Sequence, residues 1–284
     1  MENKILILGA SGFVGNAIYK ELLPYFDVYG TYFSTNNFFK QNQIFYHFDL
    51  EKDDVELILN DIRPHIIISA LRGNYTALYA LHQQLFTYVM ATPFCKLLFL
   101  SSVRVFDGIK TNASYENNKT LANTSYGKNK IAIEKLLSPL PSHKYAILRL
   151  PMVLGVNAPR VILLKESIKN KCKFEVFPNL VINITSDTKL SQQIHYIINQ
   201  NKFGIFHLGS TDLVHHSDLF LEIAEKLGGN LPIFTNTFTS NEDHFLAVLP
   251  KENKLPLQHQ ITVNEVIKEI TCNESLITLK EKLI

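Results

Sequence analysis

The sequence has no tryptophan and only three cysteines. The scarcity of cysteine argues against a disulfide-rich protein and against a cysteine-ligated metal site. Cys95, Cys172 and Cys272 are isolated from one another, so they form neither a disulfide framework nor the spacing of a metal site. We therefore predict no metal, and we expect the thiols to stay reduced in a cytoplasmic protein.

Long apolar runs and strong net charge are also missing. No apolar run approaches the roughly 20 residues of a membrane-spanning helix, and Ile5-Leu-Ile-Leu8 is too short for the core of a signal peptide. A formal net charge of +2, without a basic block, gives no reason to expect nucleic acid. We expect neither a membrane nor a nucleic-acid partner.

What the sequence does contain is a regular alternation of buried strands and helices. Of its 284 residues, 46% are hydrophobic, which is ample for a large core. Strands are predicted at 4–8, 28–33, 44–48, 64–70, 96–102 and 145–150, and helices at 14–23, 53–60, 75–90 and 126–139. Because the strands are apolar throughout, they favour a parallel sheet with helices on both faces. Right-handed crossovers then predict a doubly wound α/β sheet of the Rossmann type, with ligands at the carboxyl ends of its strands.

Beyond residue 150 the predicted elements are shorter. Helices are expected at 161–170, 190–200, 217–227 and 265–284, and strands at 174–176 and 204–208. These pieces look too short for a second large core. We expect them to form a small C-terminal lobe against the carboxyl edge of the sheet.

A glycine turn follows the first predicted strand. Gly9-Ala-Ser-Gly12-Phe-Val-Gly15 lies directly between that strand and an amphipathic helix. Glycine lets a phosphate approach the backbone, and a helix N-terminus offers unpaired N–H groups to a pyrophosphate. The arrangement is typical of dinucleotide binding, although glycines that serve only close packing would give the same pattern.

The end of the second predicted strand bears on the choice of dinucleotide. An acidic residue there would bind a ribose diol, but this sequence has Thr31-Tyr32-Phe33-Ser34. A 2′-phosphate would meet no repelling carboxylate, which favours NADP(H) over NAD(H), although no arginine is present as a clamp. Asp49, after the third strand, could accept a hydrogen bond from adenine or simply favour a helix N-terminus. Phe38-Phe39 could cover the adenine.

Tyr126 and Lys130 lie four residues apart in a predicted helix. Residues at this spacing share one helix face, so the phenol and the ammonium can point into one pocket. A free phenol titrates at about pH 10, and a cation nearby favours the phenolate. Taken alone, Tyr-x-x-x-Lys is a common coincidence, so its meaning depends on the surrounding motifs.

Several motifs occur together in the order of one family. They are Gly9-Ala-Ser-Gly12-Phe-Val-Gly15, Asp49-Leu50, Phe99-Leu-Ser-Ser102-Val-Arg-Val-Phe-Asp107-Gly108, Tyr126-Gly-Lys-Asn-Lys130 with Glu134, Leu148-Arg149-Leu-Pro-Met-Val-Leu-Gly155 and Gly204-Ile-Phe-His-Leu-Gly-Ser210. On these residues the chain resembles an extended short-chain dehydrogenase/reductase, and most closely the dTDP-4-dehydrorhamnose reductase branch. The resemblance covers most of the chain and is densest over residues 1–155.

This resemblance implies domains, roles and site residues. It implies an NAD(P)-binding Rossmann domain over 1–155 and a small substrate-binding lobe over 156–284, interleaved with the sheet. Tyr126 would protonate the substrate oxygen as hydride reaches the carbon, Lys130 would favour the phenolate and hold the nicotinamide ribose, and Ser102 would bind the carbonyl. The cofactor-binding residues that it implies are Gly9, Ser11, Gly12, Phe13, Val14, Gly15, Asp49, Leu50, Ala70, Leu71, Tyr126, Lys130 and Pro151.

Three departures from the branch fall where substrate would lie. Val103-Arg104 replaces an Asp-Tyr pair, the loop Leu71-Arg-Gly-Asn-Tyr75 is short, and Asn183-Ile-Thr-Ser-Asp-Thr188 stands in place of an Arg-Pro-Thr signature. Arg72 and Arg104 are candidates for binding an anionic part of the substrate, because arginine suits phosphate recognition. Surface salt bridges are the competing explanation for both.

Three functions are compatible with these observations. The first is an NAD(P)H-dependent reductase of a keto-sugar nucleotide. The second is a sugar-nucleotide epimerase or dehydratase that keeps its cofactor bound, although dehydratases normally carry an acid pair beside the serine. The third is a non-catalytic dinucleotide-binding regulatory subunit. The family often forms homodimers through the two helices that flank the fifth strand, so a homodimer is one further implication of the resemblance.

Overall fold

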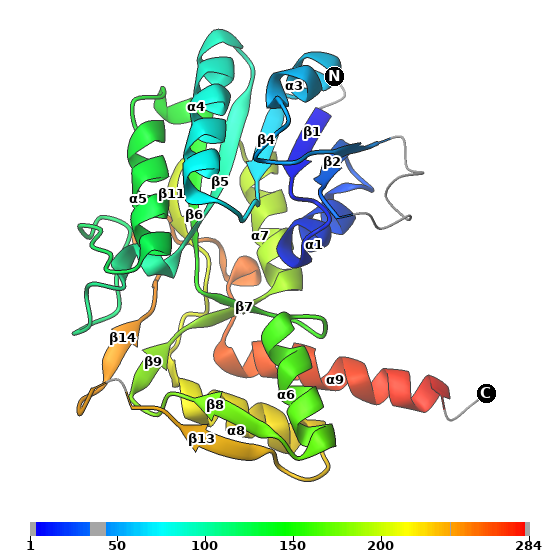
Figure 1. Cartoon of the computed structure of the whole chain (residues 1–284), viewed down its shortest axis with the longest axis vertical. Coiled ribbons are helices and arrows are strands. Elements are labelled where there is room, and N and C mark those ends of the chain that lie inside the picture. The colour runs from blue at the N-terminus through cyan, green and yellow to red at the C-terminus, as the bar shows by residue number, and fades with distance from the viewer. Residues whose placement is uncertain (1–3, 35–43, 239, 282–284) are drawn as a thin grey trace.

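The larger part of the molecule is a seven-stranded parallel sheet. The computed structural model describes residues 4–34, 44–238 and 240–281 (Figure 1). The strands of the sheet are β1 (Lys4–Leu8), β2 (Asp27–Tyr32), β3 (Phe45–His47), β4 (Ile66–Ser69), β5 (Lys96–Ser102), β6 (Tyr145–Leu150) and β11 (Gly204–His207). Their order is β11-β6-β5-β4-β1-β2-β3, which confirms the predicted Rossmann-type α/β fold. The Phe38-Phe39 pair lies outside the described residues.

Helices cover both faces of this sheet (Figure 1). One face carries α1 (Phe13–Leu22) and α7 (Asp187–Asn199), and the other carries α3 (Val55–Ile62), α4 (Tyr75–Ala91) and α5 (Ser125–Leu137). Within β1, Ile5 and Ile7 belong to the first core, whereas Leu6 and Leu8 belong to the second. A strand buried on both faces needs apolar residues at every position, which explains the unbroken apolar runs in the sequence.

The order of the strands reverses between β1 and β4. These two strands are neighbours, and their register pairs Leu8 with Ser69, so both end at the same edge of the sheet. The chain continues from β1 toward β2 and β3 on one side, and from β4 toward β5 and β6 on the other. Loops that leave in opposite directions open a crevice, which is where ligands of such sheets bind.

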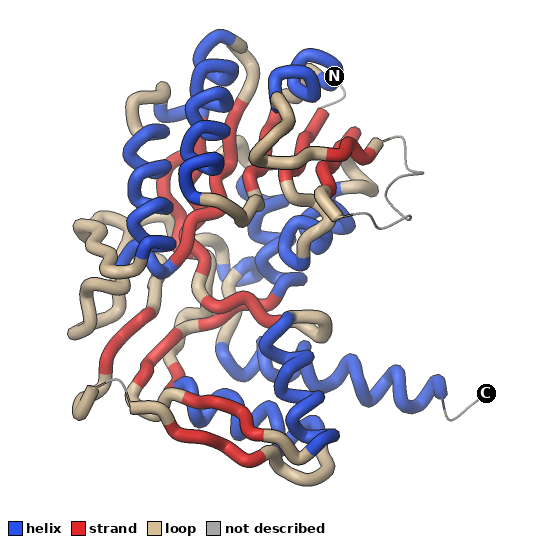
Figure 2. Tube along the Cα trace, in the orientation of Figure 1, coloured by secondary structure: helices blue, strands red, loops and turns tan. Residues whose placement is uncertain are grey.

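The remaining elements form a separate lobe with its own core. Its elements are β7 (Met152–Leu154), α6 (Pro159–Asn170), β8 (Lys173–Val176), β9 (Leu180–Ile182), β10 (Ile184–Ser186), β12 (Val214–His215), α8 (His216–Leu227), β13 (Ile233–Asn236), β14 (His244–Leu246) and α9 (Val263–Glu281). Figure 2 shows that short strands alternate here with helices. Phe174, Phe220 and Ile267 are among the fully buried members of one continuous cluster. The expectation that these pieces are too short for a second large core was therefore wrong.

Two late elements join the main sheet rather than the lobe. β11 pairs with β6, and α7 packs on the same core as α1. α7 begins at Asp187 rather than at the predicted Leu190, because the Ser186 side chain accepts a hydrogen bond from the Lys189 N–H at 3.0 Å. Among the described residues, no helix combines the length and the apolar character needed to cross a bilayer.

Candidate active site

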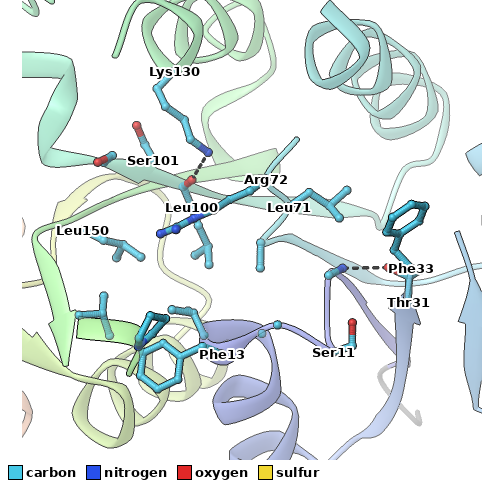
Figure 3. Close-up of a pocket in the computed structure, with 18 of the residues that line it drawn as sticks. Ser11, Phe13, Thr31, Phe33, Leu71, Arg72, Leu100, Ser101, Lys130 and Leu150 are labelled. Carbon is cyan, nitrogen blue, oxygen red and sulfur yellow. Dashed lines mark hydrogen bonds between the residues drawn. The ribbon is translucent and has the colours of Figure 1, made fainter. Parts of the chain in front are cut away.

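A cavity of about 530 Å³ opens at the reversal point of the sheet (Figure 3). Its walls come from the glycine turn after β1, the end of β2, the loop after β4, the ends of β5 and β6, and α5. The predicted cofactor-binding residues that line it are Gly9, Ser11, Gly12, Phe13, Val14, Gly15, Ala70, Leu71, Tyr126, Lys130 and Pro151. The fold thus brings together side chains that are far apart in the sequence.

Asp49 and Leu50 are not among the residues that line this cavity. The Asp49 carboxylate instead accepts a hydrogen bond from the Glu51 N–H at 3.0 Å and pairs with the Lys52 ammonium at 3.2 Å. The hydrogen bond from Glu51 is the main cause that lowers the pKa of Asp49. The proposed contact of Asp49 and Leu50 with a cofactor therefore stays a prediction.

The glycine turn is shaped to receive a pyrophosphate. Gly9 has a φ of +86°, which only glycine adopts without strain, and its N–H donates to Thr31 Oγ1 at 2.8 Å. A Cβ at Gly15 would lie 2.2 Å from the Gly9 carbonyl oxygen, so α1 packs directly on the turn. No side chain caps the α1 N-terminus at Gly12, and its first turn holds no acidic residue. Free N–H groups and the positive end of the helix dipole therefore fit a phosphate anion.

The end of β2 forms the opposite part of this cavity. Thr31, Tyr32 and Phe33 line it, and no aspartate or glutamate does so among the described residues. A 2′-phosphate on the adenosine ribose would meet no repelling carboxylate at this wall. Thr31 has a second role, because its hydroxyl and carbonyl oxygens accept hydrogen bonds from the glycine turn.

Ser102, Tyr126 and Lys130 lie together in the same cavity. Ser102 is the last residue of β5, and Tyr126 and Lys130 lie in the first turns of α5. Thr124 Oγ1 caps this helix by accepting a hydrogen bond from the Gly127 N–H at 3.1 Å. The Asp107 carboxylate in turn accepts a hydrogen bond from the Thr124 N–H at 3.3 Å. The cap fixes where α5 begins and thereby the positions of its phenol and ammonium.

The ammonium of Lys130 is almost completely buried, with 4% of the residue exposed. It donates to the Leu100 carbonyl oxygen at 2.8 Å and lies 4.5 Å from the centre of the Phe99 ring and 5.8 Å from that of Tyr126. Burial and, to a smaller extent, the charge of Arg72 lower the pKa of Lys130 to about 7, against an opposing effect of the Glu134 charge. Near neutral pH this lysine can therefore either hold or release a proton.

Glu134 joins α5 to the sheet behind the cavity. Its Oε1 accepts hydrogen bonds from Ser101 Oγ at 2.5 Å and from Arg149 Nε at 3.1 Å, and its Oε2 accepts one from Arg149 Nη2 at 2.8 Å. Both members of this ion pair are buried, at 7% and 3% exposure. The bidentate pair sets the position of α5 relative to β5 and β6, and therefore that of Tyr126 relative to Ser102.

A second cavity of about 560 Å³ continues from the first toward the lobe. The two share Arg72, Ser102, Tyr126, Pro151 and Met152 in their walls. The second is also lined by Gly73, Tyr75, Leu78, Val103, Arg104, Arg160, Phe177, Leu180, Ile182, His216 and Leu246. Among the described residues, no acidic side chain lines it. The cavities thus meet at Ser102 and Tyr126, among the residues that they share.

Some residues of these walls escaped the sequence analysis. Arg160 and His216 of the lobe line the second cavity, but neither follows a strand of the main sheet. His216 accepts a hydrogen bond from the Phe177 N–H at 3.3 Å, and burial lowers its pKa to about 4, so the imidazole is neutral. The sequence carried one signal for Arg160, a proline that directly precedes it and suits the start of a helix. Phe33 also lines the first cavity, and its position at the end of the predicted strand 28–33 could be read from the sequence.

The Rossmann-type sheet, the glycine turn and the adjacent Ser, Tyr and Lys side chains define an NAD(P)-dependent oxidoreductase. Residues 5–171 match the model of the NAD dependent epimerase/dehydratase family, and residues 89–265 match that of the RmlD substrate binding domain. The chain belongs to this epimerase/dehydratase family, the extended short-chain dehydrogenase/reductases, and carries the RmlD substrate binding domain. The predicted resemblance is confirmed at this level.

Solved structures show the same fold at low sequence identity. A dTDP-4-dehydrorhamnose reductase from Clostridium acetobutylicum is 20% identical, with a TM-score of 0.77 over 97% of this chain and 99% of that one. The enzyme of that name from Bacillus anthracis, in complex with NADP, is 19% identical, with a TM-score of 0.75 over 96% and 100%. A Thermus thermophilus UDP-glucose 4-epimerase in complex with NAD is 15% identical, with a TM-score of 0.76 over 94% and 98%. No curated protein matches the sequence.

Proposed function

We propose that the protein is an NADPH-dependent reductase of a keto-sugar nucleotide. The observation that carries this proposal is that Ser102 and Tyr126 line both cavities. A cofactor on the glycine-turn side and a substrate on the lobe side would therefore meet at these two hydroxyls. The similarity to dTDP-4-dehydrorhamnose reductases and the RmlD substrate binding domain support a sugar nucleotide as the substrate.

The two parts of the chain would have separate roles, one for the cofactor and one for the substrate. We propose that residues 1–155 bind the cofactor and that residues 156–284 provide the substrate-binding lobe, apart from β11 and α7, which pack with the sheet. The glycine turn and the α1 N-terminus would hold the pyrophosphate, and Pro151, Tyr126 and Lys130 would lie at the nicotinamide end. When bound, the nicotinamide supplies the hydride.

The side chains of this chain supply the proton and the orientation. The Ser102 hydroxyl donates a hydrogen bond to the substrate carbonyl and orients it beside Tyr126. As the carbonyl carbon gains hydride, its oxygen takes the phenolic proton of Tyr126, and an alcohol results. The buried Lys130 ammonium stabilises the phenolate that is left, because a cation within a few Å favours that form. Positioned acid catalysis of this kind contributes about 10²–10⁴-fold to the rate.

Tyr126→Phe tests this proposal. We expect the variant to lose turnover, measured as NADPH oxidation with a panel of 4-keto-sugar nucleotides. Its affinity for NADPH should stay within about ten-fold of the original, because the phenol adds one hydrogen bond at most. Undiminished oxidation in Tyr126→Phe would refute the role of the phenol. Binding of NADPH without any oxidation across the panel would instead favour a regulatory protein.

The preference for NADPH is a separate part of the proposal. It is supported by the wall of Thr31, Tyr32 and Phe33, which holds no carboxylate. Titration followed by the fluorescence of the reduced nicotinamide should give a lower Kd for NADPH than for NADH. Equal or tighter binding of NADH would refute this preference but leave the proposed reduction intact.

A further inference from the structure

The cationic residues of the second cavity are unevenly distributed along it. Arg160 comes from the lobe, whereas Arg72 and Arg104 come from the sheet side, after β4 and β5. Arg104 lies two residues after Ser102, and its N–H donates to Ser102 Oγ at 3.2 Å. Arg72 lines both cavities, and its charge acts on Lys130. Both residues thus follow strands that end beside Ser102, with the Arg72 charge acting on Lys130 and the Arg104 charge acting on His244 of β14.

These two guanidinium groups differ from Arg160 in what they contact. Arg160 stacks 4.4 Å from the centre of the Phe174 ring and donates a hydrogen bond to the Glu175 carbonyl oxygen. Within the described residues, the side chains of Arg72 and Arg104 make neither an ion pair nor a hydrogen bond, and both residues are exposed. Figure 3 shows the Arg72 side chain extending into the first cavity. Arg160 therefore already has contacts within the protein, whereas the guanidinium donors of Arg72 and Arg104 are available to a ligand.

The chemistry of the substrate follows from this placement. In a sugar nucleotide the reacting carbonyl belongs to the sugar, and the diphosphate lies at the sugar's far end. With the carbonyl at Ser102 and Tyr126, the lobe residue Arg160 would be left for the diphosphate. A neutral sugar would give Arg72 and Arg104 only hydroxyl partners. A carboxylate would accept charge-assisted hydrogen bonds from them, in the planar geometry that suits guanidinium groups.

We propose that the sugar of the substrate carries a carboxylate, so that the protein acts on a nucleotide-linked sugar acid held by Arg72 and Arg104. This inference rests on the proposed function and specifies its substrate class. The second cavity has no acidic side chain among its described lining residues, so no charge of that wall would repel a carboxylate.

Matched ligands that differ only at this group test the inference. UDP-glucuronate and UDP-glucose share a nucleotide and a ring, as do GDP-mannuronate and GDP-mannose, and each pair differs by a carboxylate in place of a hydroxymethyl group. Their Kd values would be measured by calorimetry on the full chain saturated with NADP⁺, at about 0.15 M salt to screen distant charges. The variants are Arg72→Gln and Arg104→Gln. The control is Arg63→Gln, which removes an exposed arginine outside both cavities.

We expect the acid of at least one pair to bind about ten-fold tighter than its neutral partner, the effect of one charge-assisted contact. Arg72→Gln and Arg104→Gln should each reduce this advantage, while Arg63→Gln should preserve it. Equal binding of acid and neutral ligands would overturn the inference, as would an advantage that survives in both variants. Turnover of neutral keto-sugar nucleotides without any preference for acids would overturn it and leave the proposed reductase intact. If NADP⁺ binds but no sugar nucleotide does, both the inference and the proposed substrate class are refuted.

Discussion

Replacing Glu134 by glutamine tests whether the ion pair behind the cavity holds α5 in place. Glutamine keeps the shape of the side chain but removes its charge. Arg149, only 3% exposed, would then keep its guanidinium without a carboxylate, and an amide NH₂ would face one of its own donors. Breaking a buried pair by removing one partner costs about 3–5 kcal/mol, because an uncompensated charge stays buried.

We therefore expect the free energy of unfolding of Glu134→Gln to fall by about 3–5 kcal/mol. At about 2 °C per kcal/mol for a chain of this size, the Tm would drop by about 6–10 °C. Urea unfolding followed by circular dichroism measures the first quantity, and a thermal scan measures the second. The matched control is Glu166→Gln, an exposed glutamate on α6, which should change stability by less than about 0.5 kcal/mol.

A second variant separates the cost of a lone charge from the value of the pair. Replacing both residues by apolar ones, as in Glu134→Leu with Arg149→Met, should recover most of the stability that Glu134→Gln loses. The double variant should still lose turnover, because Ser101 loses its acceptor and α5 its fixed position. A loss below about 1 kcal/mol in Glu134→Gln would show that the guanidinium finds other compensation, and would refute the reasoning.

Two further predictions concern the cavity itself. The pKa of Lys130 falls from 10.5 to about 7 on folding, so between these values the unfolded chain binds the proton and the folded chain does not. Stability without ligands should therefore gain a contribution that rises with pH from about 7 to about 10. Urea unfolding across this range should show that Lys130→Met lacks the rise, and an identical pH slope in both proteins would contradict the shift. Gly15→Ala should disrupt the glycine turn and lower both the Tm and the affinity for NADPH, because its Cβ would lie 2.2 Å from the Gly9 oxygen. Gly12→Ala, whose Cβ would lie 3.4 Å from the same oxygen, should keep its Tm, and an equal loss in both variants would argue against the packing account.

The main sheet was predictable because its strands are apolar on both faces. Runs such as Lys4–Leu8 and Lys96–Ser102 are short and mostly apolar, which is typical of buried parallel strands. The lobe was less accessible, because its strands are short and pair across long stretches of chain. β9, for example, pairs with both β12 and β14. Local pattern cannot indicate such partners, so the second core stayed hidden.

In the candidate site, too, the residues of the main sheet were predictable and those of the lobe were not. Residues at or directly after the end of a strand, such as Gly9, Ala70 and Ser102, were predictable, because parallel strands end at one edge of the sheet. Asp49 also follows a strand, yet it does not line the cavity. Position at the edge does not determine where a side chain points, and here local hydrogen bonds hold the Asp49 carboxylate. Arg160 and His216 could not be predicted, because only the folding of the lobe brings them to the second cavity.

The spacing of α5 explains how one helix serves both the chemistry and the fold. Tyr126, Lys130 and Glu134 recur every four residues and so share one face. Along that face the exposure decreases from the half-buried Tyr126 to the buried Lys130 and Glu134. The phenol can reach a substrate, the ammonium contacts the end of β5, and the carboxylate lies in the sheet interior with Arg149. Arg149 and Ser101 take both carboxylate oxygens, so Glu134 acts on Lys130 through its charge alone. We therefore expect the charge of the ligand, as well as the shape of its sugar, to decide what this site accepts.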